Sequence, residues 1–334
     1  MSILIKEPEV IKLGAEYLRI VSLSYTVTAI SFAFSISLRT TGRPNVPLKV
    51  SIISFLTNTI FNYILIFGHL GFEPMGVKGA AIGTLIARIV EILLILYAIY
   101  GTKSILAASV KELMSWHKDF LKKYIETTYP VVITEGFWAL GQVLYAMAYA
   151  RIGEEATAAV QLTNTIQNLF FVVVRGLANA CNIMVGAKIG GGDEKVAYDY
   201  AVRFIFLSTI SGLALGVIMA LTPDIILKLF RGLDSSLYNT SRALLIVLGI
   251  TFVIRVYNTI AIVGVLRAGG DTKIAMRIDL GTVWLIGVPL AFIGALVLKL
   301  PIHQLVLLVT LEEVVKALVG IPIIKSGKWI KNLT

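Results

Sequence analysis

Nine apolar runs, each long enough to cross a lipid bilayer, divide this chain of 334 residues. They cover residues 15–37, 48–68, 78–100, 127–149, 156–186, 197–221, 240–266, 275–297 and 303–324. A helix needs about 20 predominantly apolar residues to cross the hydrocarbon core. Charged residues make up only 15% of the chain and hydrophobic residues 57%. The runs predict an all-α integral membrane protein with nine transmembrane helices, and this composition excludes a soluble enzyme.

The basic residues of the loops indicate the orientation of the chain. Alternate loops, beginning with 38–49 and ending with 325–334, hold 17 Lys or Arg residues, whereas the other loops and the N-terminal segment 1–14 hold 7. Cytoplasmic loops of membrane proteins carry the excess of basic residues. We therefore expect a multi-pass protein of the cell membrane with its C-terminus in the cytoplasm and the N-terminus of this chain outside. The net charge of +10 then reports orientation, and a nucleic-acid partner is not needed to explain it.

A weak internal repeat predicts two lobes. Residues 38–42 (LRTTG) align with 266–270 (LRAGG) at an offset of 228, and the same offset aligns Arg88 with Lys316. Six spans separate the copies, so both copies have the same orientation, as in the parallel repeats of secondary transporters. This alignment divides the chain into three parts. Residues 1–100 form the second half of an N-lobe with three transmembrane helices, residues 101–126 form a cytoplasmic linker, and residues 127–334 form a complete six-helix C-lobe. On this reading three spans that precede Met1 in a full two-lobed protein are missing.

Several motifs resemble those of multidrug and toxic compound extrusion (MATE) transporters. Residues 38–47 (LRTTGRPNVP), Asn58, Asn62 and residues 76–84 (GVKGAAIGT) resemble the fourth to sixth helices of that family. The later motifs 158–161 (AAVQ), 185–193 (VGAKIGGGD) and 266–272 (LRAGGDT) are similar to its eighth and tenth helices. Each motif alone is weak, but their order and spacing together are specific.

The resemblance implies a twelve-helix exporter of small organic cations and drugs that is driven by the inward movement of sodium ions or protons. It implies no cofactor, and it implies that this chain lacks the family's first three helices. An incomplete N-lobe would then favour association with another chain. Two alternatives stay open: a flippase of lipid-linked oligosaccharides from the same superfamily, and a truncated fragment that does not transport.

Glu135 is the foremost candidate for binding the coupling cation. A carboxylate in an apolar span is costly unless it has a cation, a proton or a partner helix. The resemblance implies that Glu135 contributes to such a site, with Asn258 nearby, although Val256 stands where the family's NorM-like branch has an aspartate. The structural alternative is an ion pair between Glu135 and Arg255 or Arg175.

Polar residues recur along one face of the span 156–186 and predict the wall of a substrate cavity. Gln161, Asn168, Arg175 and Asn182 are seven residues apart, and Asn164 and Asn179 lie close to the same line. A polar line of this length must face water or protein rather than lipid. We add Gln142, which lies on the same face as Glu135, and Arg255 to this predicted cavity. Hydrogen bonding between helices explains the line equally well.

Two further pairs of charges are expected to be structural. Arg88 and Glu91 are three residues apart, and Glu312 and Lys316 are four apart, so each pair suits an ion pair within one helix. The sequence contains no cluster of metal ligands, no phosphate-binding loop and no nucleophile triad, which argues against an enzyme or an ATP-driven pump.

Overall fold

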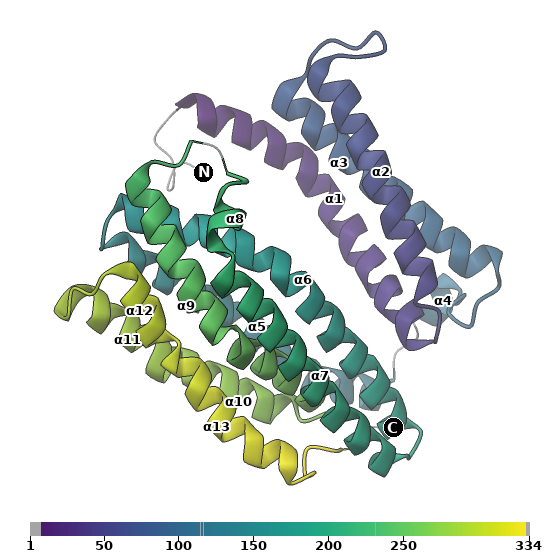
Figure 1. Ribbon diagram of the computed structural model, residues 1–334. Coiled ribbons are helices and arrows are strands. Elements are labelled where there is room, and N and C mark those ends of the chain that lie inside the picture. The colour runs from purple at the N-terminus through teal and green to yellow at the C-terminus, as the bar shows by residue number, and fades with distance from the viewer. Residues whose placement is uncertain (1–7, 114, 116, 231, 332–334) are drawn as a thin grey trace. The chain divides into compact units, whose positions relative to one another are not determined.

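The computed structural model describes residues 8–113, 115, 117–230 and 232–331, and every regular element in these residues is a helix (Figure 1). The expected all-α membrane fold is confirmed. The chain forms two compact units, Met1–Trp116 (unit 1) and His117–Thr334 (unit 2). The boundary between the units falls inside the segment 101–126 that we expected to be a linker.

Unit 1 contains three long helices. Its elements are α1 (Pro8–Thr40), α2 (Asn45–Phe67), α3 (Gly76–Leu96), the π-helical segment η1 (Tyr97–Gly101) and the short α4 (Val110–Leu113). Helix α3 packs against both α1 and α2. A small apolar core of Leu38, Val50, Ile95 and Ile99 joins the three long helices at one end. Unit 1 therefore buries few side chains of its own, and most of its apolar side chains are exposed.

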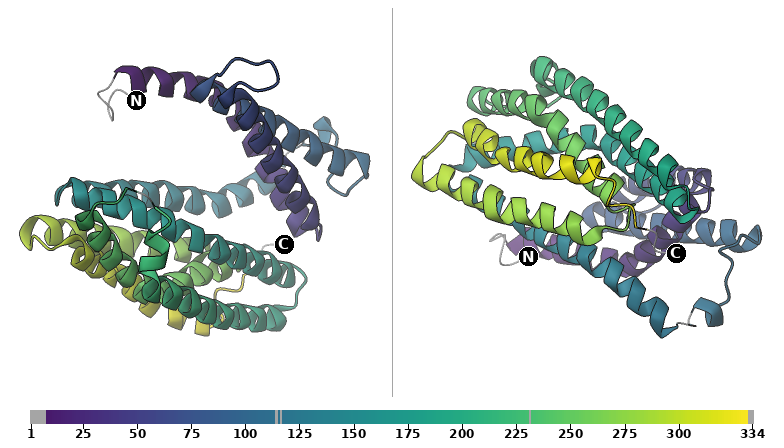
Figure 2. Two further views of the ribbon diagram at one scale, coloured as in Figure 1. Left: turned by 45° about the horizontal axis from the view of Figure 1, so that its top comes forward. Right: turned by 90° about the horizontal axis from the view of Figure 1, so that it is seen from below.

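Unit 2 is a larger bundle whose long helices run beside one another (Figure 2). Its first elements are α5 (Lys118–Ala150), α6 (Glu154–Gly190), α7 (Glu194–Leu221), α8 (Pro223–Leu227), α9 (Ser235–Thr259) and η2 (Ile260–Leu266). The later elements are α10 (Thr272–Thr282), η3 (Val283–Gly287), α11 (Val288–Phe292), η4 (Ile293–Val297), α12 (Ile302–Val309) and α13 (Leu311–Lys325).

Helix α9 lies at the centre of unit 2. It packs against α6, α7, α12 and α13, and half of its most apolar window is buried, against a third or less in the other spans. Glycines allow the closest of these contacts. A Cβ atom added to Gly216 of α7 would lie 2.5 Å from the carbonyl oxygen of Gly249 in α9, so only glycine fits at this crossing.

Within the described residues, eight helices are long and apolar enough to cross a membrane, where the sequence predicted nine. The ninth run, 303–324, forms two shorter helices, α12 and α13, that meet at Thr310. The hydroxyl of Thr310 donates a hydrogen bond of 2.8 Å to the carbonyl oxygen of Val306. Such bonds from Ser or Thr to the preceding turn are compatible with a bend in the helix. Thr134 and Thr163 make the same bond inside α5 and α6, which continue unbroken, so the bond alone does not explain the break.

The expected linker is shorter in the structure than in the prediction. Residues 118–126, which we assigned to the linker, form the first turns of α5. This segment contains good helix formers such as Lys122, Lys123 and Glu126, and Asp119 lies in its first turn, where a negative charge stabilises a helix.

The two copies of the internal repeat fold into the same turn. In unit 1 the amide of Arg43 donates to the carbonyl oxygen of Leu38 at 2.8 Å, and Gly42 has a φ of 77°. In unit 2 the amide of Asp271 donates to the carbonyl oxygen of Leu266 at 3.1 Å, and Gly270 has a φ of 79°. A hydrogen bond that spans five residues around a left-handed glycine is the Schellman ending of a helix. The offset of 228 thus relates two turns of one geometry.

Candidate functional site

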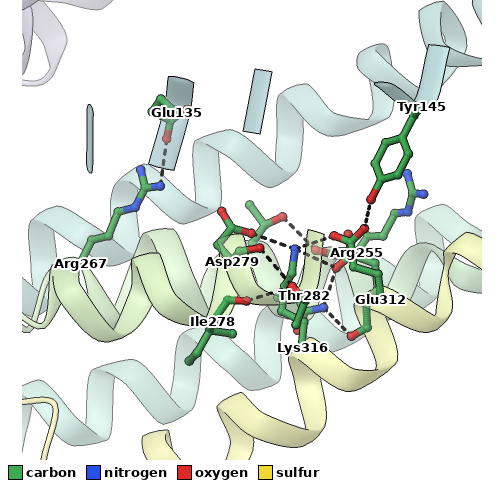
Figure 3. Close-up of polar contacts among 12 residues, drawn as sticks. Glu135, Tyr145, Arg255, Arg267, Ile278, Asp279, Thr282, Glu312 and Lys316 are labelled. Atoms are coloured by element: carbon green, nitrogen blue, oxygen red, sulfur yellow. Dashed lines mark hydrogen bonds and ion pairs between the residues drawn. The ribbon is translucent and has the colours of Figure 1, made fainter. Parts of the chain in front are cut away.

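Glu135 forms an ion pair with Arg267 (Figure 3). The Arg267 Nη2 atom donates to the Glu135 Oε1 atom at 2.9 Å. The two residues lie on different elements: Glu135 is in α5, and Arg267 follows η2 in the turn before α10. The Glu135 side chain remains 60% exposed, whereas that of Arg267 is only 17% exposed. Glu135 therefore has an arginine partner from a distant turn, but this partner is neither Arg255 nor Arg175, the two residues that the sequence suggested.

The predicted polar line occupies the outer face of α6. Five of its side chains are exposed and make no hydrogen bond within the described chain: Gln161, Asn164, Asn168, Arg175 and Asn179. The opposite face of α6 carries buried residues such as Ala159, Val174 and Val185. Asn182 differs from the rest, because its Nδ2 atom donates to the carbonyl oxygen of Val263 at 2.9 Å. Gln142 on α5 is also exposed. Most of the line is thus available to another group, and Asn182 serves a contact between helices.

A buried charge network lies inside unit 2, centred on Lys316 (Figure 3). The Lys316 Nζ atom lies 2.8 Å from Asp279 Oδ1, 3.2 Å from Glu312 Oε1 and 3.8 Å from Glu313 Oε2. The predicted pair of Glu312 and Lys316 is therefore one contact of a larger set. All four side chains are largely buried, so one ammonium group faces three carboxylates in a region that water barely reaches.

Neutral donors complete this network. The hydroxyl of Tyr145 in α5 donates to Glu312 Oε2, and Asn258 Nδ2 in α9 donates to Glu313 Oε2 at 2.7 Å. Gly287 of η3 makes room for the first contact, since a Cβ atom there would lie 2.2 Å from Glu312 Oε2. Asn258, which we predicted beside the Glu135 cation site, therefore has its amide bound to Glu313. The structure gives Glu135 and Asn258 different partners.

Sequence reasoning missed the roles of Asp279, Glu313 and Tyr145 in this network. Three charged residues within one turn and a half, Glu312, Glu313 and Lys316, were the signal that an apolar helix carried more than one ion pair. Arg255, predicted for the cavity, is partly buried, and its Nε atom has no hydrogen-bond partner within the described chain.

Unit 1 holds a polar pocket of about 380 Å³ between α2 and α3. It is lined by Ser51, Ser54, Phe55, Asn58, Thr84, Ala87, Arg88 and Glu91. The ion pair expected from the sequence is present, with Arg88 Nη1 2.6 Å from Glu91 Oε2. Asn58 Nδ2 lies 3.4 Å from Thr84 Oγ1. Hydroxyl, amide and carboxylate oxygens are the ligands that hard cations prefer. In this pocket, however, Arg88 already neutralises Glu91, which is the one carboxylate of the lining.

Comparison with known proteins identifies relatives over almost the whole chain. The profile of the family described as MatE matches residues 1–64 and 130–293. A protein of Thermotoga maritima named "Probable multidrug resistance protein NorM" is 24% identical over 330 residues, covering 98% of this chain and 69% of that protein. The Bacillus subtilis protein named "Uncharacterized transporter YisQ" is 24% identical, covering 95% of this chain and 69% of its own length. The Photorhabdus laumondii protein also named NorM is 28% identical, and only 53% of its length is covered.

Solved structures share the fold. A transporter of the MOP superfamily from Pyrococcus furiosus aligns with a TM-score of 0.86 at 19% identity, covering 96% of this chain and 72% of that chain. A structure described as the outward-facing conformation of a multidrug resistance MATE family transporter aligns with a TM-score of 0.87 at 18% identity, covering 97% and 72%. In both cases the likeness concerns the fold.

Proposed function

Because this chain belongs to the MatE family, whose members are membrane transporters rather than enzymes, we propose that it takes part in secondary active efflux of organic cations or drugs. The inward movement of sodium ions or protons drives this export. The relatives named as multidrug resistance proteins support the substrate class, and each of them is longer than this chain.

The exposed polar line of α6 is the observation that carries the proposal. A helix long and apolar enough to cross a membrane does not leave amides without partners against lipid, because each unsatisfied polar group costs several kcal/mol in hydrocarbon. Neutral amides offer hydrogen bonds to many substrates without trapping a positive charge. The line therefore suits the wall of a path for cationic drugs.

The same line argues against the flippase alternative. A phosphate-linked lipid calls for several basic side chains, since guanidinium groups bind phosphate in pairs of hydrogen bonds. Arg175 is the one basic residue among the six predicted positions from Gln161 to Asn182, and Arg255 is partly buried. An organic cation is the better fit to a surface of this charge.

The Glu135–Arg267 pair is our proposed coupling site. A proton or a sodium ion that binds Glu135 competes with Arg267, and release of Arg267 frees the turn before α10. Coupling requires that the cation and the drug each bind one conformation more tightly than the other. The coupling ion must also be able to reach its site, and the Glu135 carboxylate is exposed enough for this.

Efflux of a fluorescent cation from proteoliposomes, under an imposed sodium or proton gradient, tests the proposal. We expect Glu135→Gln to remove most of the gradient-driven efflux, because the neutral amide takes up no proton and lacks the negative charge that holds a sodium ion. Glu91→Gln is the matched variant in the pocket of unit 1. If gradient-driven efflux survives Glu135→Gln but is lost in Glu91→Gln, coupling belongs to unit 1. If the unaltered protein shows no gradient-driven efflux, the proposed function is refuted.

A further inference from the structure

The segment that follows α13 folds back onto the turn that carries Arg267. We call residues 326–331 the C-terminal strap. Trp329 is completely buried, and its Nε1 atom donates to the carbonyl oxygen of Ile324 at 3.0 Å. The indole ring covers Gly269 so closely that an added Cβ atom would lie 2.3 Å from the ring atom Cε3. Only glycine fits under this ring.

Lys331 fastens the strap to both sides of Gly270. Its backbone amide donates to the carbonyl oxygen of Gly269 at 2.9 Å, and its Nζ atom lies 2.9 Å from Asp271 Oδ1. The Asp271 side chain is only 4% exposed, so its charge depends on Lys331 for compensation. A backbone hydrogen bond and a buried ring thus hold Gly269, and an ion pair holds Asp271.

These contacts lie within four residues of Arg267. The amide of Gly270 donates to the carbonyl oxygen of Arg267 at 3.2 Å, which makes Arg267 part of the same closed turn. On its other side the turn is joined to α5, because the hydroxyl of Thr272 donates to the carbonyl oxygen of Thr127 at 3.2 Å. The strap and α5 therefore hold the turn from two directions, and Glu135 lies on α5.

Unit 1 contains the same arrangement in a weaker form. There the Arg43 Nη1 atom donates to the Thr102 Oγ1 atom at 3.1 Å, in an exposed contact. The offset of 228 relates Arg43 to Asp271 and Thr102 to Ile330. The segment after the last long helix thus meets the repeated turn in both units. Among the residues that the structure describes, only unit 2, which carries Glu135, adds a buried carboxylate and a covering tryptophan at this turn.

We propose that the C-terminal strap positions Arg267 against Glu135, with Trp329 and Lys331 as its positioning residues. The inference rests on the proposed role of Glu135 in coupling. A strap that holds the turn keeps the guanidinium group in place, so a cation must displace Arg267 from a fixed position. When the strap is loosened, Arg267 competes less well, and the cation binds Glu135 at lower concentration.

Hydrogen exchange of the purified protein tests whether the strap holds the turn, and this measurement needs no transport assay. In Lys331→Ala the amides of residues 266–272 should exchange about tenfold faster, the factor that corresponds to the loss of one charged hydrogen bond. Lys328→Ala, an exposed lysine of the same strap with no ion pair in the described chain, should leave them unchanged. Unchanged exchange in Lys331→Ala overturns the proposal.

The effect of the strap on coupling is tested by the concentration of the coupling ion, sodium or proton, that gives half-maximal efflux of the fluorescent cation. This concentration should fall several-fold in Lys331→Ala and in Arg267→Ala. It should equal the original value in Lys331→Arg. In the double variant that combines the two alanine changes, it should fall no further than in either single variant. Additive effects of the two alanine changes would overturn the positioning role. So would an unaltered dependence of efflux on the coupling ion in Lys331→Ala despite faster hydrogen exchange, because the strap would then only stabilise the turn. If the unaltered protein shows no gradient-driven efflux, the proposed function fails, while hydrogen exchange still decides whether the strap holds the turn.

Discussion

At the scale of single residues, the burial of Lys316 is the most demanding feature of this protein. Its ammonium group is the common neighbour of Asp279, Glu312 and Glu313. Removing one partner of a buried ion pair leaves an uncompensated charge, which costs more than the pair itself contributes. Tyr145 and Asn258 supply hydrogen bonds to the carboxylates but no positive charge. Lys316 therefore decides whether the packing of α10 against α13 is stable.

Lys316→Met should lower the free energy of unfolding by about 3–5 kcal/mol, because it leaves three carboxylates without their shared cation. The midpoint of thermal unfolding in detergent measures this loss. Glu312→Gln in the same background should restore part of it by removing one of the three charges.

Arg88→Met is the matched change in unit 1. Its side chain is 42% exposed, so the loss of its pair with Glu91 should cost below about 1 kcal/mol. Equal losses in the two methionine variants would show that burial of the Lys316 network contributes nothing to stability.

Sequence reasoning identified which residues carry charge at membrane depth and which of them meet within one helix, but not which of them meet across helices. The spacing of Arg88 with Glu91, and of Glu312 with Lys316, predicts contacts within one helix, and both contacts are present. Contacts between helices depend on how each helix is rotated and on how deeply it lies. Arg267 and Glu135 are 132 positions apart, and no periodicity in the sequence relates them.

At the scale of elements, small residues set how closely helices approach. Helices α7 and α9 meet at Gly216 and Gly249, where backbone touches backbone. Such contacts compensate for the weak driving force between helices in lipid, since the gain comes from close packing rather than from the exclusion of water. The crossing is one of the helix contacts, together with those to α6, α12 and α13, that make α9 the most buried span of unit 2.

Gly249→Ala should destabilise the protein by about 1–3 kcal/mol, because its new methyl carbon would lie 2.6 Å from the carbonyl oxygen of Gly216. Gly176→Ala on α6 is the control. Nothing lies within 4 Å of its added Cβ atom, so the unfolding midpoint should stay the same or rise slightly. A comparable loss in both variants would contradict a role for the glycine crossing.

Element types and approximate bounds followed from apolar runs and from the breakers between them. The runs 48–68 and 197–221 end within one residue of α2 and α7. The division of the last run at Thr310 was not predictable, because threonine is common inside membrane helices. The π-helical segments η3 and η4 were also unforeseen, since hydropathy does not report the pattern of backbone hydrogen bonds.

At the scale of the whole molecule, the alternating charge of the loops predicts which side of the membrane each loop occupies. The turns at Gly42, Gly192 and Gly270 all fall in segments rich in basic residues. The strap contributes Lys328 and Lys331 to the same side. The charges therefore predict that the strap lies in the cytoplasm and that the loop between α2 and α3 lies outside.

Labelling of single cysteines in cells tests this orientation. In a background where Cys181 is replaced by serine, Glu73→Cys should react with a membrane-impermeant maleimide in intact cells. Lys328→Cys should react only after the membrane is permeabilised. Cys181 itself is fully buried, so the unaltered protein should label weakly. The opposite pattern of labelling reverses the predicted orientation.

The two turns at Gly42 and Gly270 keep one shape with different residues beside them. Their shared shape depends on a backbone hydrogen bond and a left-handed glycine, whereas the next residue is Arg43 in one copy and Asp271 in the other. Such a turn tolerates different neighbouring side chains, because its backbone supplies its own restraint. In unit 2 the neighbouring aspartate is the buried partner of a lysine 60 residues further along, a contact that leaves the shape of the turn unchanged.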